Sequence, residues 1–285
     1  MTRWEALGQT IIPADDPAPR VMGIVNVTPD SFSDGGRYLG LNEAVEHGRR
    51  LIAEGAHLLD IGGESSRPGS EPIGLDEELW RIIPVVEGLA GVGVFLSVDT
   101  TKAEVARRAI AAGASIINDI TAMSGDPEMA RVVADSGAGV VLMHMQGNPR
   151  TMQDSPHYED VVAEVYEFLA RRVEWAGSVG IPPERIAIDP GIGFGKTMTH
   201  NLQLLRNLGR FATLGCTLLV GISRKGFLGK ITGRPVAERA TASAVSALLA
   251  ASDGARVVRV HDVGEAVDAI KVWGVVRGWE RSETP

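Results

Sequence analysis

The chain repeats one pattern of hydrophobic and polar positions eight times. Each repeat starts with a short apolar run that ends in Asp, Asn, His, Ser or Arg, and a loop and a helical pattern follow. The first run is Val21 to Val25, and it ends in Asn26. A short, continuous apolar run is typical of a strand buried on both faces, as in a parallel sheet. The pattern therefore predicts eight parallel strands with polar residues at their ends.

The order of the predicted elements indicates the fold. The other strands are predicted at residues 56–63, 93–100, 115–120, 138–145, 186–189, 217–223 and 256–261. Strands that alternate with helices favour an α/β fold, a single (β/α)8 TIM barrel, over an open doubly wound sheet. We expect an irregular or hairpin lead-in at 1–20 that covers the barrel bottom, the barrel at 21–278 and a tail at 279–285. Long loops are expected after strands 1 and 2, and Asn42 is expected to cap the first helix.

Composition and charge narrow the classes of protein. A chain of 285 residues with 44% hydrophobic content can bury one large core, and barrels of about 250 residues are ordinary single domains. The net charge of −8 argues against a nucleic-acid partner and against an anionic membrane surface. No signal-peptide pattern and no apolar run of about 20 residues is found, so a cytoplasmic protein is expected.

Three residues of reactive types lack a supporting pattern. Cys216 is the only cysteine, so it is expected to be a small buried residue. Ser223 has no base near it in the sequence, so a nucleophilic serine is not expected. His144 stands between two methionines and is expected to be structural.

The loop after the sixth strand is rich in glycine. Residues 191–197 read GIGFGKT and end like a P-loop, but the four-residue spacing that a P-loop needs is missing. We expect these glycines to form tight turns beside a flat ligand, with Phe194 as an aromatic wall. A plain structural turn is the alternative, and it leaves Asp189 unexplained.

Three strand ends supply side chains that suit one flat heterocycle. Asp99, Asn118 and Asp189 should converge at the C-terminal ends of the barrel strands, where active sites of such barrels lie. Carboxylates accept from a ring N–H and an exocyclic amine, and an amide both donates and accepts, so the set suits an amino-pyrimidinone edge. Lys225 would bond the ring carbonyl. Pairing with lysines or helix capping is the structural alternative, because buried carboxylates need donors.

A second set of residues suits a phosphate group and its metal. Arg67, Arg259 and His261 can hold phosphate oxygens. A solvated salt bridge is the alternative for each arginine, and a helix cap or core position is the alternative for the histidine. Asn26 and Asp34 offer the oxygen ligands that Mg²⁺ prefers beside a substrate phosphate, although either residue alone is equally typical of a turn.

Taken together, these motifs resemble the bacterial dihydropteroate synthase family. The resemblance runs from about Val21 to Trp273. It is carried by ordered motifs at the strand ends, namely GIVNVTPDSFSDGG from 23, DIGGESSRPG from 60, SVDT from 97, ND from 118, DPGIGFGK from 189, SRK from 223 and RVH from 259. One motif alone would not be specific, but the ordered set is. Ser66 is a mild departure, because many relatives have Thr there.

The resemblance implies a transferase of folate biosynthesis. Such an enzyme condenses (7,8-dihydropterin-6-yl)methyl diphosphate with 4-aminobenzoate and releases 7,8-dihydropteroate and pyrophosphate. The resemblance also implies Mg²⁺ as the cofactor, sulfonamides as competitive inhibitors and a homodimer through the later outer helices. The arrangement of charges favours a dissociative path, and a concerted displacement remains open.

The resemblance also assigns roles to individual residues. It implies a pterin site of Asp99, Asn118, Met143, Asp189, Phe194 and Lys225. It implies a diphosphate site of Asn26, Arg67, Arg259 and His261, with Asn26 and Asp34 at the metal. The aminobenzoate site would comprise Phe32, Ser66, Pro68, Phe194 and Ser223. The catalytic residues would be Arg67, Lys225, Arg259, His261 and Asp34.

Two other functions remain open at this point. One is a methyltetrahydrofolate-binding methyltransferase, whose barrel handles a similar ring but has no use for Arg67, Lys225 and the Arg259/His261 pair as a diphosphate site. The other is a catalytically silent paralogue that binds a pterin or a protein partner, against which the intact set of cationic residues argues.

Overall fold

Eight parallel strands form a closed barrel, which confirms the predicted (β/α)8 fold. The fold is that of a computed structural model, which describes residues 2–27 and 37–279. The barrel strands, in spatial order from β10 through β3 to β9, are hydrogen-bonded in an unbroken circle. They are β3 (Arg20–Asn26), β4 (Leu58–Gly62), β5 (Phe95–Asp99), β6 (Ile116–Asp119), β7 (Gly139–Met143), β8 (Ile186–Asp189), β9 (Thr217–Gly221) and β10 (Val257–Val260).

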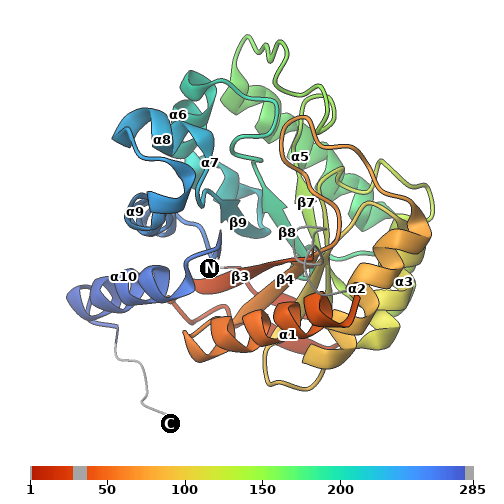
Figure 1. Cartoon of the computed structure of the whole chain (residues 1–285). Coiled ribbons are helices and arrows are strands. Elements are labelled where there is room, and N and C mark those ends of the chain that lie inside the picture. Colours follow the sequence, from red (N-terminus) through yellow and green to blue (C-terminus); the bar gives the residue numbers. More distant parts are fainter. Residues whose placement is uncertain (1, 28–36, 280–285) are drawn as a thin grey trace.

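Helices surround the barrel (Figure 1). They are α1 (Arg37–Ala53), α2 (Leu75–Leu89), α3 (Ala103–Ala112), α4 (Met129–Ser136), α5 (Val161–Ser178), α6 (Met198–Arg206), α7 (Leu208–Phe211), α8 (Gly226–Thr232), α9 (Ala240–Ser252) and α10 (Val263–Val276), with short 3-10 turns at Pro183–Arg185, Ala212–Leu214 and Val236–Glu238. Among the described residues, no helix is long and apolar enough to cross a membrane. The prediction for Asn42 is wrong, because α1 begins at Arg37 and Asn42 lies inside the helix.

The lead-in forms a hairpin that covers the bottom of the barrel, as expected. Its strands β1 (Trp4–Ala6) and β2 (Gln9–Ile12) are antiparallel. Trp4 and Ile12 are fully buried against Met22 and Leu58, which lie at the starts of β3 and β4, and against residues of the other barrel strands. The bottom of the barrel is therefore filled with apolar side chains.

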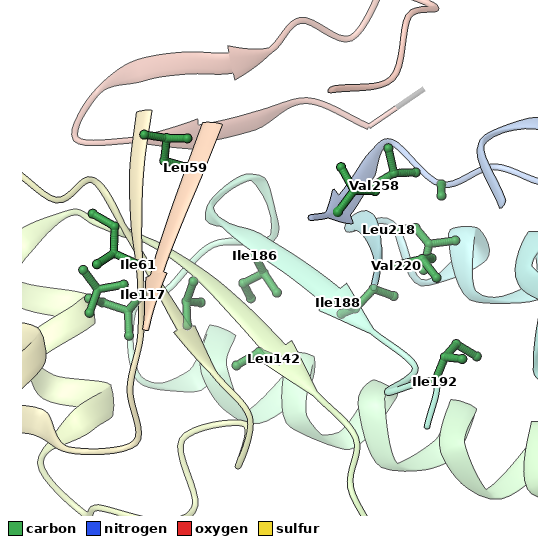
Figure 2. Close-up of a cluster of buried hydrophobic side chains, with 14 of the residues drawn as sticks. Leu59, Ile61, Ile117, Leu142, Ile186, Ile188, Ile192, Leu218, Val220 and Val258 are labelled. Atoms are coloured by element: carbon green, nitrogen blue, oxygen red, sulfur yellow. The ribbon is translucent and has the colours of Figure 1, made fainter. Parts of the chain in front are cut away.

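Alternation along the strands separates an outer core from the barrel interior. Leu59 and Ile61 of β4 belong to the large cluster between the strands and the helices, together with Ile117, Ile188 and Val220 (Figure 2). Successive side chains of a strand point to opposite faces, so their neighbours in sequence face the interior. Residue Asp60, between Leu59 and Ile61, therefore brings a carboxylate inside the barrel.

Candidate active site

A polar layer lies above the apolar bottom of the barrel, and Asp60 is at its centre. The Asp60 side chain is fully buried. Its Oδ1 accepts from Ser97 Oγ at 2.6 Å, and its Oδ2 accepts from Asn118 Nδ2 at 3.0 Å and from Arg259 Nε at 2.6 Å. Strands β4, β5, β6 and β10 supply these side chains. Three donors satisfy the buried carboxylate, which would otherwise be costly.

Sequence reasoning gave Asp60 no role beyond membership of a motif. A signal was available, because Asp60 is a single carboxylate within the apolar run Leu58-Leu59-Asp60-Ile61, which was predicted to be a buried strand. A carboxylate at such a position needs donors from neighbouring strands. The identity of those donors depends on strand register, which sequence does not provide.

Asp99 lies beside this layer and shares the guanidinium of Arg259. Arg259 Nη2 donates to Asp99 Oδ2 at 3.2 Å, and Asp99 is the register partner of Asn118 on β6. Burial and the nearby Asp60 raise the pKa of Asp99 to about 7, while Arg259 acts in the opposite direction. The predicted convergence of Asp99 and Asn118 is therefore present, and Arg259 lies among these acidic groups.

Asp189 lies at the end of β8 and is the register partner of Met143. It is buried, and its Oδ1 accepts from the Gly191 backbone N–H at 2.7 Å. Burial raises the pKa of Asp189 to about 6, and nearby cations, including Lys225 and Arg259, act in the opposite direction. Burial lowers the pKa of Lys225 to about 8, with Asp189 again opposing the shift. The two groups thus stabilise each other's charged forms.

The glycine-rich loop presents Phe194 beside Lys225, as an aromatic wall would require. Lys225 Nζ lies 4.1 Å from the centroid of the Phe194 ring. Gly191, Gly193 and Gly195 have φ angles of 68°, 83° and 59°, which favour glycine. The predicted tight turns are therefore confirmed.

Ser223 and His261 form a pair at the ends of β9 and β10. Ser223 Oγ accepts from the His261 backbone N–H at 3.1 Å and lies 3.0 Å from His261 Nδ1. The sequence places no base near Ser223, and the imidazole beside it comes from the next strand of the barrel. Burial, followed by the charges of Arg259 and Arg224, lowers the pKa of His261 to about 4, so the imidazole is neutral near pH 7. The pair is suited to hydrogen bonding with a ligand.

The remaining predicted residues lie at the rim. Asn26 is exposed at the end of β3. Ser66, with Asp99 and Thr100, lines a small hollow, whereas Arg67 and Pro68 are exposed in the loop between β4 and α2. No contact among the described residues joins Arg67 to Arg259 or His261. Phe32 and Asp34 lie outside the described residues.

Cys216 and His144, the other two residues of reactive types, are both buried. Cys216 is buried just before β9, as expected. His144 is buried after β7, and its Nδ1 lies 3.0 Å from Lys196 Nζ. His144 therefore contacts Lys196, the charged residue of the glycine-rich loop, to which sequence reasoning gave no role.

The barrel mouth combines carboxylate and amide acceptors with cations on β10 and at the start of α8. Such a set can receive the N–H groups of a flat amino-pyrimidinone and an anionic substituent beside it. Fold and site together define a pterin-binding enzyme. In agreement, the profile of the family described as "Pterin binding enzyme" matches residues 22–261.

Individual relatives narrow the class. Dihydropteroate synthase of Escherichia coli (strain K12) is 48% identical over 255 residues, which are 89% of this chain and 90% of the relative. A Xanthomonas albilineans dihydropteroate synthase in complex with 7,8-dihydropteroate superposes with a TM-score of 0.85 at 47% identity, over 99% of this chain and 100% of that one. The Yersinia pestis dihydropteroate synthase in complex with a sulfonamide drug superposes with a TM-score of 0.89 at 44% identity, over 97% of this chain and 99% of that one. The chain belongs to the dihydropteroate synthase family.

Proposed function

We propose that the chain condenses (7,8-dihydropterin-6-yl)methyl diphosphate with 4-aminobenzoate to give 7,8-dihydropteroate and pyrophosphate in folate biosynthesis. The observation that carries the proposal is the polar layer in which Asp60 binds Asn118 and Arg259 while Arg259 also binds Asp99. This layer lies inside a chain that belongs to the dihydropteroate synthases. A relative of the same fold is known in complex with 7,8-dihydropteroate, the product of this reaction.

In the proposed pterin site, each polar group has a defined role as hydrogen-bond donor or acceptor. Asn118 Nδ2 donates to Asp60, so the amide oxygen is left to accept from the ring. Asp99 and Asp189 accept from the remaining N–H and amine groups, and Lys225 donates to the ring carbonyl. Met143 and Phe194 border the flat faces of the ring.

The diphosphate is proposed to lie on the side of the site that His261 and Arg259 share, with Arg67 reaching it from the rim. These groups stabilise the negative charge that accumulates on pyrophosphate as the C–O bond breaks. The carboxylates of Asp99 and Asp189 tolerate positive charge on the pterin methylene. The amine of aminobenzoate then forms a bond to this carbon and gives up one proton, which the departing pyrophosphate can accept. No protein nucleophile is required, which agrees with the hydrogen-bonded state of Ser223.

Mg²⁺ fits the donor set on the first loop. An amide oxygen from Asn26, a carboxylate from Asp34, phosphate oxygens and water form the mixed ligand set that Mg²⁺ favours. Asn26 ends β3 with an exposed side chain, at the end of the barrel where the diphosphate is proposed to bind. Bound Mg²⁺ would supply charge neutralisation to the diphosphate.

The aminobenzoate is proposed to bind between the rim loops. Ser66 and Pro68 from the loop after β4, Phe32, Phe194 and Ser223 would surround it. Because sulfonamides share the shape and polarity of aminobenzoate, we propose that they compete for this site. The complex of the Yersinia pestis relative with a sulfonamide drug supports this proposal.

We further propose that the protein is a homodimer through α9 and α10, which contact one another. Both helices expose large apolar side chains, including Leu249 at 59% and Val275 at 79% of the fully exposed area. Exposed large apolar side chains on two neighbouring helices are the kind of surface that a partner subunit can cover.

Pyrophosphate release from the pterin diphosphate, with and without 4-aminobenzoate and Mg²⁺, tests the proposed reaction. We expect release that depends on the amine and is accompanied by dihydropteroate. Release at the same rate without the amine, or amine-dependent transfer from methyltetrahydrofolate, would contradict the proposal.

A further inference from the structure

A buried lysine lies behind the proposed pterin site. Lys196 is 3% exposed, and its Nζ contacts three neutral acceptors. These are His144 Nδ1 at 3.0 Å, His144 O at 3.3 Å and Phe194 O at 2.9 Å. An ammonium group has three N–H donors, so the number of acceptors matches the charged form. None of the roles proposed above uses this residue.

The histidine partner is arranged to accept. His144 Nδ1 can accept from Lys196 only in the neutral tautomer that carries its proton on Nε2. Burial, followed by the charge of Lys196, lowers the pKa of His144 to about 3, which keeps the ring neutral near pH 7. The ring packs edge-on against Phe168, with centroids 4.9 Å apart. His144 is therefore held in place as an acceptor.

The same contacts press the glycine-rich loop against the end of β7. A Cβ on Gly191 would come within 1.9 Å of His144 O, and one on Gly195 within 2.6 Å of Gln146 O. Tyr158 also donates its hydroxyl to Gly195 O at 2.9 Å. The loop backbone that carries Phe194 is therefore packed closely against the residues that follow β7.

Lys196 also acts on Asp189 through its charge. Burial raises the pKa of Asp189, and the cations that oppose this shift are Lys225, Lys196 and Arg259. Lys225 and Arg259 belong to the ligand site, whereas the ammonium of Lys196 is bound to the protein on all three of its N–H groups. Lys196 is thus a cation near Asp189 whose hydrogen bonds do not change partner when a ligand enters.

Other titratable groups also face this region. Burial lowers the pKa of Lys196 to about 7, Asp189 on β8 opposes the shift, and Lys225 at the start of α8 adds to it. His200 on α6 has its pKa lowered by burial and then by Lys196. Both histidines near the ammonium are therefore disfavoured as cations, and Lys196 supplies the local positive charge.

We propose that Lys196 is a positioning residue for the pterin site, whose ammonium fixes the glycine-rich loop to His144 and keeps the Asp189 carboxylate ionised to receive the pterin. The inference rests on the proposed role of Asp189 in pterin binding. It assigns a function to the Gly-Lys pair that resembles, but does not form, a P-loop.

Calorimetric titration with 6-hydroxymethyl-7,8-dihydropterin, a pterin without the diphosphate, between pH 5 and pH 8 tests the proposal. Loss of the charge in Lys196→Met lets the pKa of Asp189 rise, so the acidic limb of the binding profile should move up by on the order of one pH unit. Near pH 5, below both pKa values, this corresponds to roughly tenfold weaker binding, and near pH 6 to roughly fivefold. A profile that superposes on that of the wild type would overturn the inference.

Arg185→Met is the matched control. Arg185 is a half-buried cation that directly precedes β8, at the end opposite Asp189, where its Nε donates to Ala138 O at 3.0 Å. Its loss should reduce thermal stability without moving the pH profile. An equal movement in both variants would show that Lys196 acts only on the fold, and would also overturn the inference.

A pair of variants at His144 covers the case in which Lys196→Met does not fold. His144→Leu removes one acceptor of the ammonium, and His144→Asn supplies an oxygen in its place. We expect weaker pterin binding in His144→Leu and recovered binding in His144→Asn. Wild-type binding in both variants would refute the positioning role of Lys196. Asp189→Ala distinguishes the two proposals, since normal pterin binding in that variant would contradict the proposed function itself.

Discussion

Single buried charges determine how the interior of this barrel is organised. Asp60 accepts from three side chains on three other strands, and Arg259 connects it to Asp99. Each of these groups is held by a partner of the opposite charge or by a hydrogen-bond donor. A residue can therefore be essential to the site without contacting a ligand.

Asp60→Ala should strongly destabilise the protein. The substitution leaves Ser97 and Asn118 without their buried acceptor and leaves Arg259 with Asp99 as its remaining carboxylate partner. Breaking one partner of a buried ion pair costs about 3 kcal/mol or more. Urea unfolding measures the change in the free energy of unfolding. The exposed Asp154→Ala serves as the control and should stay within about 0.5 kcal/mol of the wild type. Equal stability of the two variants would contradict the central role of Asp60.

Asp99→Asn should gain stability relative to the wild type as pH rises. The pKa of Asp99 is raised to about 7 in the folded protein, whereas an unfolded Asp titrates near about 3.9. Between these values the folded state binds more protons than the unfolded state, so the contribution of Asp99 to stability falls as pH rises. The difference in thermal stability between variant and wild type, measured from pH 4 to pH 8 without ligand, should therefore move in favour of Asn. A difference that does not change with pH would contradict the raised pKa.

For individual residues, the sequence predicted where a side chain lies better than it predicted which side chains it contacts. Asp99, Asn118 and Asp189 could be identified because parallel strands bring their ends to one rim. The neighbour of Ser223 could not, because His261 follows in sequence only after two intervening helices. Arg259 was expected to hold phosphate oxygens. Its ion pairs with Asp60 and Asp99 were not predicted, because they depend on the Arg259 side chain pointing into the barrel.

At the level of elements, the barrel strands hold the chemistry and the loops between strands and helices complete it. The loop from β4 to α2 is anchored at its base by Glu64, which accepts from Lys102 Nζ at 2.7 Å and from the Ile73 N–H at 3.2 Å. Lys102 also donates to Glu78, which is 1% exposed on α2. One lysine thus joins the loop to α2 and to the exit of β5.

Lys102→Met should raise the KM for 4-aminobenzoate more than that for the pterin diphosphate. The substitution releases the base of the loop that carries Ser66 and Pro68, whereas the polar layer around Asp60 does not contact Lys102. We expect a rise of roughly fivefold to tenfold in steady-state assays, equivalent to about 1 kcal/mol. Lys230→Met, at an exposed position of α8, is the control. A larger effect on the pterin substrate would assign Lys102 to the other site.

Element boundaries show where sequence patterns lose precision. Apolar runs located all eight barrel strands to within a few residues, because burial on both faces leaves a clear pattern. The start of α1 was missed because Asn42, a typical capping residue, lies within the helix. Tertiary packing of the helix, and not its capping preference, decides where it begins.

For the molecule as a whole, the exposed apolar face of α9 and α10 predicts its assembly. Val275→Lys places a charge among the exposed apolar side chains of α10 and should shift the mass in solution from dimer to monomer. Val179→Lys is the control, because Val179 is an apolar residue that is 39% exposed and directly follows α5. Light scattering after size-exclusion chromatography measures the mass. A wild-type protein that is monomeric at micromolar concentration would contradict the proposed dimer.

The fold was predictable as a whole because one repeat unit accounts for nearly the entire chain. The alternation of apolar runs with helices specifies the barrel, and the ordered strand-end motifs indicate the family. The division of the interior into an apolar bottom and a polar layer was not predictable, since it depends on which residues of each strand point inward.

The N-terminal hairpin restricts how molecules reach the interior. Since Trp4 and Ile12 fill the base of the barrel, the described residues leave the opposite end as the side from which the groups around Asp60 are approached. Substrates therefore enter, and products leave, through the same opening, one after the other. A molecule bound between the rim loops would block access to the side chains around Asp60, even if it did not contact them.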